Sequence, residues 1–436
     1  MTAGSRSGFA DWVRFRYCPG MMVSTSAGRS RRNKANTPKR RVLSPLEAVM
    51  SRALDGEPVP REATYELASC EEASLPALCA AAAQLRDRGK GRTVTFSPKV
   101  FIPLTRLCRD FCGYCTFRQS PAEADSLYLT LDEVVAVAKA GKRAGCTEAL
   151  FTLGERPEQR YVEAKNWLQA SGYRSTLHYL REAASRVLSE VGLLPHLNPG
   201  TMSRRELAAL RPVSASMGIM LENLSPRLAE LGAPHHDAPS KWPKARVRAL
   251  ELAGRERVAF TTGLLVGIGE SREERIDSLL AIRDLNDRYG HIQEVIIQNF
   301  RAKTDTAMRS HADASTDEMR WTVAVARLLL GERANIQVPP NLNEENYPIF
   351  LEAGINDWGG VSPVTIDYVN PEAPWPHLSA LRERTEALGF RLKPRLPIYP
   401  ELVTDGGRLI PMALSGPIME QADADGYVKG GIERYA

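Results

Sequence analysis

Short apolar runs and segments with helical spacing alternate along most of the chain. The apolar runs, which predict strands, are 94–104, 148–153, 193–197, 213–221, 258–266, 292–300, 336–338 and 355–358. Segments with helical spacing lie between them and after the last, at 130–144, 176–191, 204–210, 244–253, 271–287, 316–330 and 377–388. Strands separated by helices are typical of a parallel sheet, and eight strands are the number that a (β/α)8 barrel requires. We therefore expect an α/β fold of the TIM-type (β/α)8 barrel class. An open doubly wound sheet is the alternative, because periodicity alone does not settle the shortest runs.

The two ends of the chain depart from this alternation. Residues 45–92 have helical spacing with no strand, which predicts a helical N-terminal extension to the barrel. The domain organisation expected from the sequence is a basic, disordered tail at 1–44, the helical extension at 45–92, the barrel at 93–402 and a C-terminal tail at 403–436.

Charge is unevenly distributed along the chain. Residues 1–41 contain ten Lys or Arg residues and one acid, Asp11, which gives this segment a charge of +9. Because the whole chain carries +5, residues 42–436 carry −4. The expected folded body is therefore mildly acidic, and its charge gives no support to a nucleic-acid function. A nucleic-acid-binding arm remains an alternative interpretation of the basic segment alone.

No apolar run in the sequence reaches the roughly 18 residues that a bilayer-spanning helix needs. The N-terminus also lacks the compact apolar core and small-residue cleavage site of a secretory signal. We therefore expect no membrane association and a cytoplasmic location, where thiols stay reduced.

Three cysteines, Cys108, Cys112 and Cys115, follow the first predicted strand with the spacing C-x3-C-x2-C. Thiolates this close together can bind one face of an iron–sulfur cluster. A [4Fe–4S] cube normally takes four cysteines, so three leave one iron open for chemistry. A closed zinc site needs a fourth ligand, and no second Cys or His pair follows; a zinc-binding module is nevertheless the non-enzyme alternative. In a barrel the loop after a strand lies on the catalytic face.

The triad, with Tyr114 before its last cysteine, resembles the radical S-adenosylmethionine (SAM) superfamily. The strings 93–117, 197–200, 298–303 and 356–363 resemble more narrowly the 7,8-didemethyl-8-hydroxy-5-deazariboflavin synthase family in its cyclising subunit. The resemblance covers about residues 85–402. It implies a [4Fe–4S] cluster held by the three cysteines, and SAM as the ligand of the open iron.

The resemblance also suggests residues that contact SAM. Gly154 and Glu155 end the second predicted strand at the position where the family binds the SAM ammonium group, although Leu153 replaces the family's first glycine. Glu222 ends the fourth predicted strand and is expected to accept the ribose hydroxyls. Gly267 and Ile268 resemble the segment that contacts adenine, and Tyr114 is expected to touch adenine through its backbone. An ordinary strand-to-loop turn with a solvated Glu is the alternative for Glu155, and a surface carboxylate in a loop is the alternative for Glu222.

The family's reaction converts 5-amino-5-(4-hydroxybenzyl)-6-(D-ribitylimino)uracil to the deazaflavin with release of ammonia, 5′-deoxyadenosine and methionine. The resemblance implies that this chain is such a lyase, with a separate tyrosine-joining radical SAM synthase supplying its small-molecule substrate. A flavodoxin or ferredoxin would supply the electron. Asn299, Arg301, Asp357 and Trp358 lie at predicted strand ends and are candidates for substrate contact, or for structural bonds at the barrel rim. The joining synthase itself and an aminofutalosine-synthase-like enzyme are the alternatives within radical SAM chemistry.

Overall fold

The structure is a computed structural model and describes residues 43–343 and 346–435. The basic segment expected at 1–44 lies almost wholly outside the described residues, and so does Cys18. Within the described residues, no helix combines the length and the apolar character needed to cross a bilayer.

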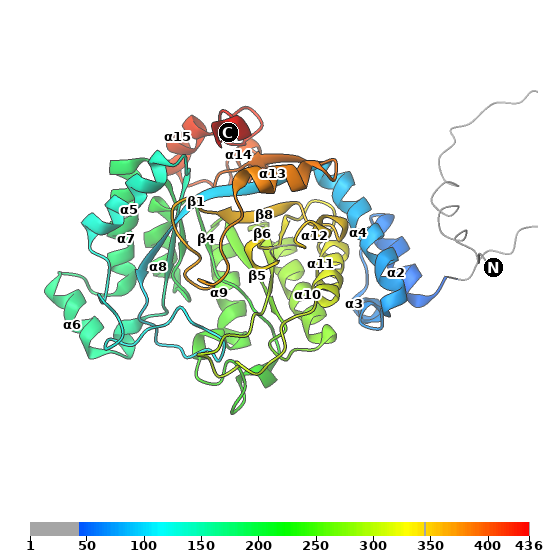
Figure 1. The fold of residues 1–436 in the computed structure, drawn as a ribbon, viewed down its shortest axis with the longest axis horizontal. Coiled ribbons are helices and arrows are strands. Elements are labelled where there is room, and N and C mark those ends of the chain that lie inside the picture. Colours follow the sequence, from blue (N-terminus) through cyan, green and yellow to red (C-terminus); the bar gives the residue numbers. More distant parts are fainter. Residues whose placement is uncertain (1–42, 344–345, 436) are drawn as a thin grey trace, which may run out of the picture. The chain divides into compact units, whose positions relative to one another are not determined.

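The strands of the described chain form one sheet in which every pairing is parallel. They are β1 Thr93–Thr105, β2 Glu148–Leu153, β3 Leu194–Asn198, β4 Ser216–Gly218, β5 Phe260–Val266, β6 Ile292–Asn299, β7 Ile336–Gln337, β8 Asp357–Val361 and β9 Arg391–Pro394. Strands β2 to β8 pair in chain order, and β1 pairs with both β2 and β8, so these eight strands close into a barrel (Figure 1). β9 adds to the first residues of β1. The barrel prediction is confirmed, and the open sheet is excluded.

Helices cover the outside of this barrel. The longer ones are α2 Pro45–Leu54, α4 Leu75–Lys90, α5 Leu131–Arg143, α6 Val162–Ala170, α7 Thr176–Arg186, α8 Arg204–Leu210, α9 Pro243–Arg255, α10 Arg272–Tyr289, α11 Thr316–Leu330, α13 Leu378–Glu386 and α15 Met412–Gln421. Shorter ones are α3 Arg61–Thr64, α12 Ile349–Glu352 and α14 Pro400–Thr404. Capping boxes define the N-termini of several helices. At the start of α5, the Thr130 hydroxyl accepts a hydrogen bond from the N–H of Glu133, and the Glu133 carboxylate accepts one from the N–H of Thr130. α4 of the N-terminal extension packs beside α11 (Figure 1).

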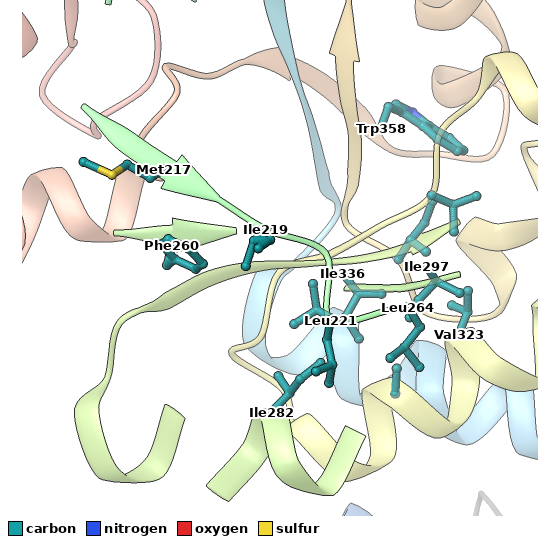
Figure 2. Packing of buried hydrophobic residues seen from close by; sticks show 14 of the residues in the cluster. Met217, Ile219, Leu221, Phe260, Leu264, Ile282, Ile297, Val323, Ile336 and Trp358 are labelled. Atoms are coloured by element: carbon teal, nitrogen blue, oxygen red, sulfur yellow. The ribbon is translucent and has the colours of Figure 1, made fainter. Parts of the chain in front are cut away.

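Apolar side chains fill the space between the strands and the outer helices. Figure 2 shows Leu264 of β5, Ile297 of β6 and Ile336 of β7 gathered near Val323 of α11. All four are at most 1% exposed. Each such side chain stabilises the fold by about 1.5–3 kcal/mol through burial, so the outward faces of the strands fix the helices onto the barrel.

Two strands, β4 and β8, depart most from their predicted bounds. β4 keeps only three residues of the predicted run 213–221, since a 3-10 turn precedes it and the chain leaves regular pairing before Glu222, whose φ is 66°. β8 begins at Asp357, two residues later than expected. Helix α6 and strand β9 were not predicted.

The segment after residue 402, expected from the sequence to be a C-terminal tail, forms α15 and contributes buried side chains to the protein core. Leu414 and Ile418 of α15 are fully buried in one cluster with Leu194, Ala215 and Ala259. These three partners start, or directly precede, β3, β4 and β5. The C-terminal segment therefore covers the end of the barrel where the strands begin.

Candidate functional site

A cavity of about 380 Å³ occupies the barrel lumen. Its lining reaches from Glu148, the first residue of β2, to the cysteine loop that follows β1. Four apolar side chains, Phe101, Leu150, Leu265 and Ile296, line it between these ends beside the polar His196 and Asn198, and we call these four the apolar belt. A cavity with an apolar belt and polar ends suits an amphipathic small molecule.

Cys108, Cys112 and Cys115 all line this cavity, and none forms a disulfide. Their loop is fixed by backbone bonds to a second loop, because the N–H groups of Phe111 and Gly113 donate to Asp237 O and Pro234 O (both 2.8 Å). Inside the triad, the Cys115 N–H donates to Cys112 O (3.2 Å). The structure thus brings the three predicted cluster ligands together on the catalytic face.

Burial controls the protonation of these thiols. It raises the pKa of Cys108 to about 12, and it also raises the pKa of Cys112, with the neighbouring thiols adding to the effect and Lys241 opposing it. Thiolates would therefore need positive charge close by, which a metal cluster provides.

The arrangement favours a cluster over a single ion. Within the described residues, no three Cys, His, Asp or Glu side chains converge as the ligands of one metal ion would. A closed zinc site needs four such ligands, whereas a [4Fe–4S] cube takes each thiolate on a different iron. Three cysteines are one ligand short of a closed zinc site, and they match the number that a [4Fe–4S] cluster with one open iron takes.

Gly154 and Glu155 lie directly beside Cys108. A Cβ on Gly154 would stand 2.0 Å from Leu107 O and 2.7 Å from Cys108 Cβ, so only glycine permits this approach. The N–H of Glu155 donates to Cys108 Sγ (3.2 Å). Its carboxylate accepts from the N–H (2.9 Å) and the hydroxyl (2.5 Å) of Thr201. Glu155 is thus at the site, with its carboxylate turned towards the loop after β3.

Glu222 forms part of a charged wall of the cavity. Its N–H donates to Gly263 O (3.0 Å) and its carbonyl accepts from Leu265 N–H (3.2 Å), which extends the β4–β5 pairing past the irregular turn. Its carboxylate forms an ion pair with Lys241 and is 4% exposed as a residue. Burial opposes ionisation of Glu222, but Lys241 and Arg246 outweigh it and hold its pKa below the usual value.

Arg246 lines the same wall and is 4% exposed. Its Nε has no hydrogen-bond partner among the described residues. A buried donor of a charged group is costly when it is left without a hydrogen bond, unless a ligand supplies the acceptor. Together with Lys241, Arg246 makes this wall a site for an anionic group next to the cysteines.

Sequence reasoning missed Lys241 and Arg246. A signal for Arg246 existed, since in α9 it shares the buried face with Ala249, Leu250 and Ala253. A cationic side chain on the buried, apolar face of a helix needs either an acidic partner or a bound ligand.

Tyr114 lines the cavity between the cysteines and this wall. Its hydroxyl and His235 Nε2 share a hydrogen bond (3.0 Å), and Lys241 Nζ lies 5.9 Å from its ring centroid. Burial, with Lys241 close by, lowers the pKa of His235 to about 3, so this imidazole is neutral.

Gly267 and Ile268, the predicted adenine segment, are not among the residues that line the cavity. Their N–H groups donate to the two carboxylate oxygens of Glu270 (both 2.8 Å), which also binds Arg275. The side chain of Ile268 is 1% exposed and packs in a small apolar cluster with Phe300. The structure does not bring this pair to the site.

The four substrate candidates divide into two pairs. Asn299 and Arg301 line the cavity, and each donates to Leu342 O, at 3.3 and 3.1 Å. Asp357 and Trp358 do not line it. They were expected at the end of a strand, but they begin β8, so they lie at the opposite end of the barrel from the cysteines.

Comparison with known proteins agrees with this geometry. The model of the Radical SAM superfamily matches residues 102–282. The 7,8-didemethyl-8-hydroxy-5-deazariboflavin synthase of Methanopyrus kandleri is 53% identical over 313 residues, which cover 72% of this chain and 93% of that protein. The chain belongs to this synthase family.

Another similar protein of this family is longer. The FO synthase of Nocardia farcinica is 50% identical over 405 residues, covering 89% of this chain and 47% of that protein. The chain thus spans about half the length of this relative, and nearly all of the synthase of Methanopyrus kandleri. Among solved structures, the FeFe-hydrogenase maturase HydG from Carboxydothermus hydrogenoformans has a TM-score of 0.66 at 20% identity, covering 81% of each chain. That similarity shows the shared barrel fold.

Proposed function

We propose that this chain converts 5-amino-5-(4-hydroxybenzyl)-6-(D-ribitylimino)uracil to 7,8-didemethyl-8-hydroxy-5-deazariboflavin with release of ammonia. The observation that carries the proposal is the placement of three free, partly buried cysteines at one end of a lumen cavity with an apolar belt. The identity of 53% to the synthase of Methanopyrus kandleri supports this choice among radical SAM reactions.

Cys108, Cys112 and Cys115 are the residues that would hold the [4Fe–4S] cluster. When bound, the cluster and SAM supply a 5′-deoxyadenosyl radical that abstracts hydrogen from the substrate. The protein's own contribution is to position both molecules and to keep water away from the reacting carbon.

The Lys241 and Arg246 wall is our proposed site for the SAM carboxylate, because the buried guanidinium of Arg246 has an Nε without a hydrogen-bond partner among the described residues. Glu222 lies on the same wall and is ionised, which suits it to accept hydroxyl donors of the ribose. Glu155 and Gly154 fix the backbone against Cys108, and Tyr114 is placed beside the same wall. For Gly267 and Ile268, adenine contact remains only the suggestion of the resemblance.

The partners and the location are part of the proposal. We propose that a tyrosine-joining radical SAM activity supplies the substrate, and that the one C-x3-C-x2-C triad of this sequence serves the cyclisation. A flavodoxin or ferredoxin would supply the electron, and the cytoplasm would keep the thiols reduced.

The test is an anaerobic assay with reconstituted protein, SAM, reductant and the hydroxybenzyl adduct. The proposal expects a fluorescent deazaflavin and stoichiometric 5′-deoxyadenosine, both lost when the three cysteines are changed to alanine. A Cys79→Ala variant, which changes a buried thiol outside the cavity, is the matched control and should keep both products. Activity on tyrosine and a diaminouracil in place of the adduct would assign the joining reaction instead.

A further inference from the structure

The end of the lumen cavity furthest from the cysteines is lined by charged and polar side chains. We call Lys99, Glu148, Thr261, Glu294, Gln337 and Arg395 the charged floor; all line the cavity and each is at most 9% exposed. None of these six residues belongs to the cysteine loop or to the wall formed by Lys241 and Arg246. A barrel interior is usually filled by branched apolar side chains, so this lining calls for another explanation.

One half of the charged floor is an ion pair between neighbouring strands. Lys99 of β1 and Glu148 of β2 are register partners, and Lys99 Nζ lies 2.8 Å from Glu148 Oε1. Glu148 Oε2 accepts from the hydroxyl of Ser97. The methylene groups of the Lys99 side chain pass directly over Gly360, and a Cβ on residue 360 would lie 2.2 Å from Lys99 Cε. The chain therefore keeps glycine at 360 so that this cation reaches the lumen, and its ammonium retains donors beyond the one used by Glu148.

The other half is built on Glu294 of β6. Glu294 Oε1 accepts from Arg395 Nη2 (2.9 Å), and its Oε2 accepts from the hydroxyl of Thr261 (2.9 Å). Arg395 also forms a two-pronged contact with Asp357, at 2.6 and 3.0 Å. Each carboxylate oxygen of Glu294 can still accept a second hydrogen bond from the cavity.

Gln337 of β7 completes the floor. It is 5% exposed, lines the cavity, and its side-chain amide makes no hydrogen bond to any described residue. A Cβ on Gly359 would stand 2.2 Å from its Nε2, so the backbone leaves room for this amide. The amide is not one of the fully enclosed unpartnered atoms and it lines the cavity, so its donors and its acceptor are free to bond a ligand there.

The floor is distant from the cysteines. Glu148 begins β2, and Thr261 and Glu294 lie near the starts of β5 and β6. Lys99 lies six residues before Thr105, where β1 ends ahead of the cysteine loop, which is about 20 Å along the strand at about 3.3 Å per residue. The apolar belt lines the cavity between the two ends, together with the buried His196, which is the register partner of Leu150. A ligand that touches both ends must be long, with a hydroxylated end and an aromatic end.

We propose that the charged floor binds the polyol chain of the substrate, so that the substrate lies with its ribityl end deep in the barrel and its hydroxybenzyl end facing the cysteines. This inference rests on the proposed function. Vicinal hydroxyls both donate and accept, which matches the spare acceptors of Glu148 and Glu294 and the spare donors of Lys99 and Gln337. The ribityl chain is unchanged between substrate and product, so it is the end that can lie away from the radical.

The reverse orientation is disfavoured by desolvation. It would place an aromatic ring against two buried ion pairs, which could not then complete their hydrogen bonds. It would also carry the carbon atoms that form the new ring away from the cysteine end.

The experiment compares the ribityl substrate with an analogue in which a methyl group replaces the ribityl chain. We expect wild-type protein to form deazaflavin from both, with kcat/KM at least about 100-fold higher for the ribityl substrate, as for sites built to bind substrate hydroxyls. In Gln337→Met and in the charge-neutral double variant K99M/E148Q this ratio should fall at least tenfold. Gln337→Met breaks no bond of the free protein, so it decides the question if the double variant fails to fold.

The matched control is K90M/E401Q, which removes a Lys–Glu pair (2.9 Å) that does not line the cavity; it should keep the wild-type ratio. A wild-type ratio near one, or a ratio unchanged in the floor variants, overturns the inference and makes the floor purely structural. Absence of deazaflavin from both substrates with wild-type protein instead refutes the proposed function, so the two failures are distinguishable.

Discussion

The N–H of Glu155 donates a hydrogen bond to Cys108 Sγ across 3.2 Å, which ties the end of β2 to the first cysteine of the triad. Hydrogen bonds to a ligating sulfur orient it and tune the metal that it binds. The contact exists because Gly154 lets the two backbones meet, with Leu107 O only 2.0 Å from the position of a Cβ.

Gly154→Ala should therefore disrupt cluster binding without removing a ligand. The added methyl group must displace the backbone of residue 107 or of residue 154, which moves Cys108. We expect the variant to retain less than half of the iron and sulfide of reconstituted wild-type protein, which should be about four each per chain. Elemental analysis and the visible absorption of the cluster measure this.

Gly416→Ala is the matched control, because the Cβ position at Gly416 in α15 has no atom within 4 Å. It should leave the cluster content unchanged. A full cluster in Gly154→Ala would show that the loop adapts and that the close approach is not required.

Arg246→Met should weaken SAM binding. Its guanidinium is buried at the cavity wall with an unpartnered Nε, and a charge-assisted bond to a carboxylate is worth about 1.5–3 kcal/mol. We expect the dissociation constant for SAM to rise about 10- to 100-fold in anaerobic equilibrium dialysis of reconstituted protein.

Arg248→Met tests the specificity of that effect. Arg248 lies two residues further along α9 and is exposed. Its loss should change SAM affinity less than twofold. Equal weakening in both variants would mean that the general positive charge of α9, rather than the buried guanidinium, attracts SAM.

The barrel could be predicted from the sequence because its evidence is local. The apolar runs that became β2 and β6 match their strands within a residue, and the cysteine spacing is a short-range motif. Position along the barrel axis was predicted less well. Asp357 was expected at a strand end, but pairing with β1 and β7 makes it the first residue of β8. Long-range pairing sets such a boundary, and the pattern of apolar residues does not record it.

The predicted SAM contacts also depend on contacts between distant segments. Gly267 resembles an adenine-contacting segment, and in the structure its N–H donates to the carboxylate of Glu270 (2.8 Å). Lys241 reaches Glu222 from a separate loop, a contact that no local motif encodes. Side chains that meet only through the closed barrel are the part of the site that sequence reasoning leaves open.

Buried His291 should make stability depend on pH. Burial lowers its pKa to about 4, while Nε2–H donates to Leu250 O (2.9 Å) and Nδ1 has no partner among the described residues. In the unfolded chain a histidine protonates near pH 6.5. Between about pH 4 and 6.5 the unfolded state therefore binds more protons, so the free energy of unfolding falls as the pH is lowered through this window.

His291→Gln keeps a donor for Leu250 and removes the titration. The free energy of unfolding, measured by urea unfolding, should decrease from pH 7 to pH 4 in both proteins. The decrease should be about 2–3 kcal/mol smaller in the variant than in wild-type protein. His178→Gln changes an exposed histidine and should follow the wild-type curve. If His291→Gln retains the full wild-type slope, the imidazole is already solvated in the folded protein.

Leu414→Ala should destabilise the barrel although it lies beyond the segment expected to form it. Leu414 is 0% exposed and packs in the cluster with Leu194, Ala215 and Ala259 at the starts of three strands. A buried Leu→Ala change costs about 2–5 kcal/mol, so the urea midpoint should fall with one cooperative transition. Met412→Ala, in the same helix but 93% exposed, should change the unfolding free energy by less than about 0.5 kcal/mol. Equal stability of the two variants would mean that α15 is not needed for the stability of the barrel. A loss of stability confined to Leu414→Ala would mean that α15, which covers the end where the strands begin, folds with the barrel as one unit.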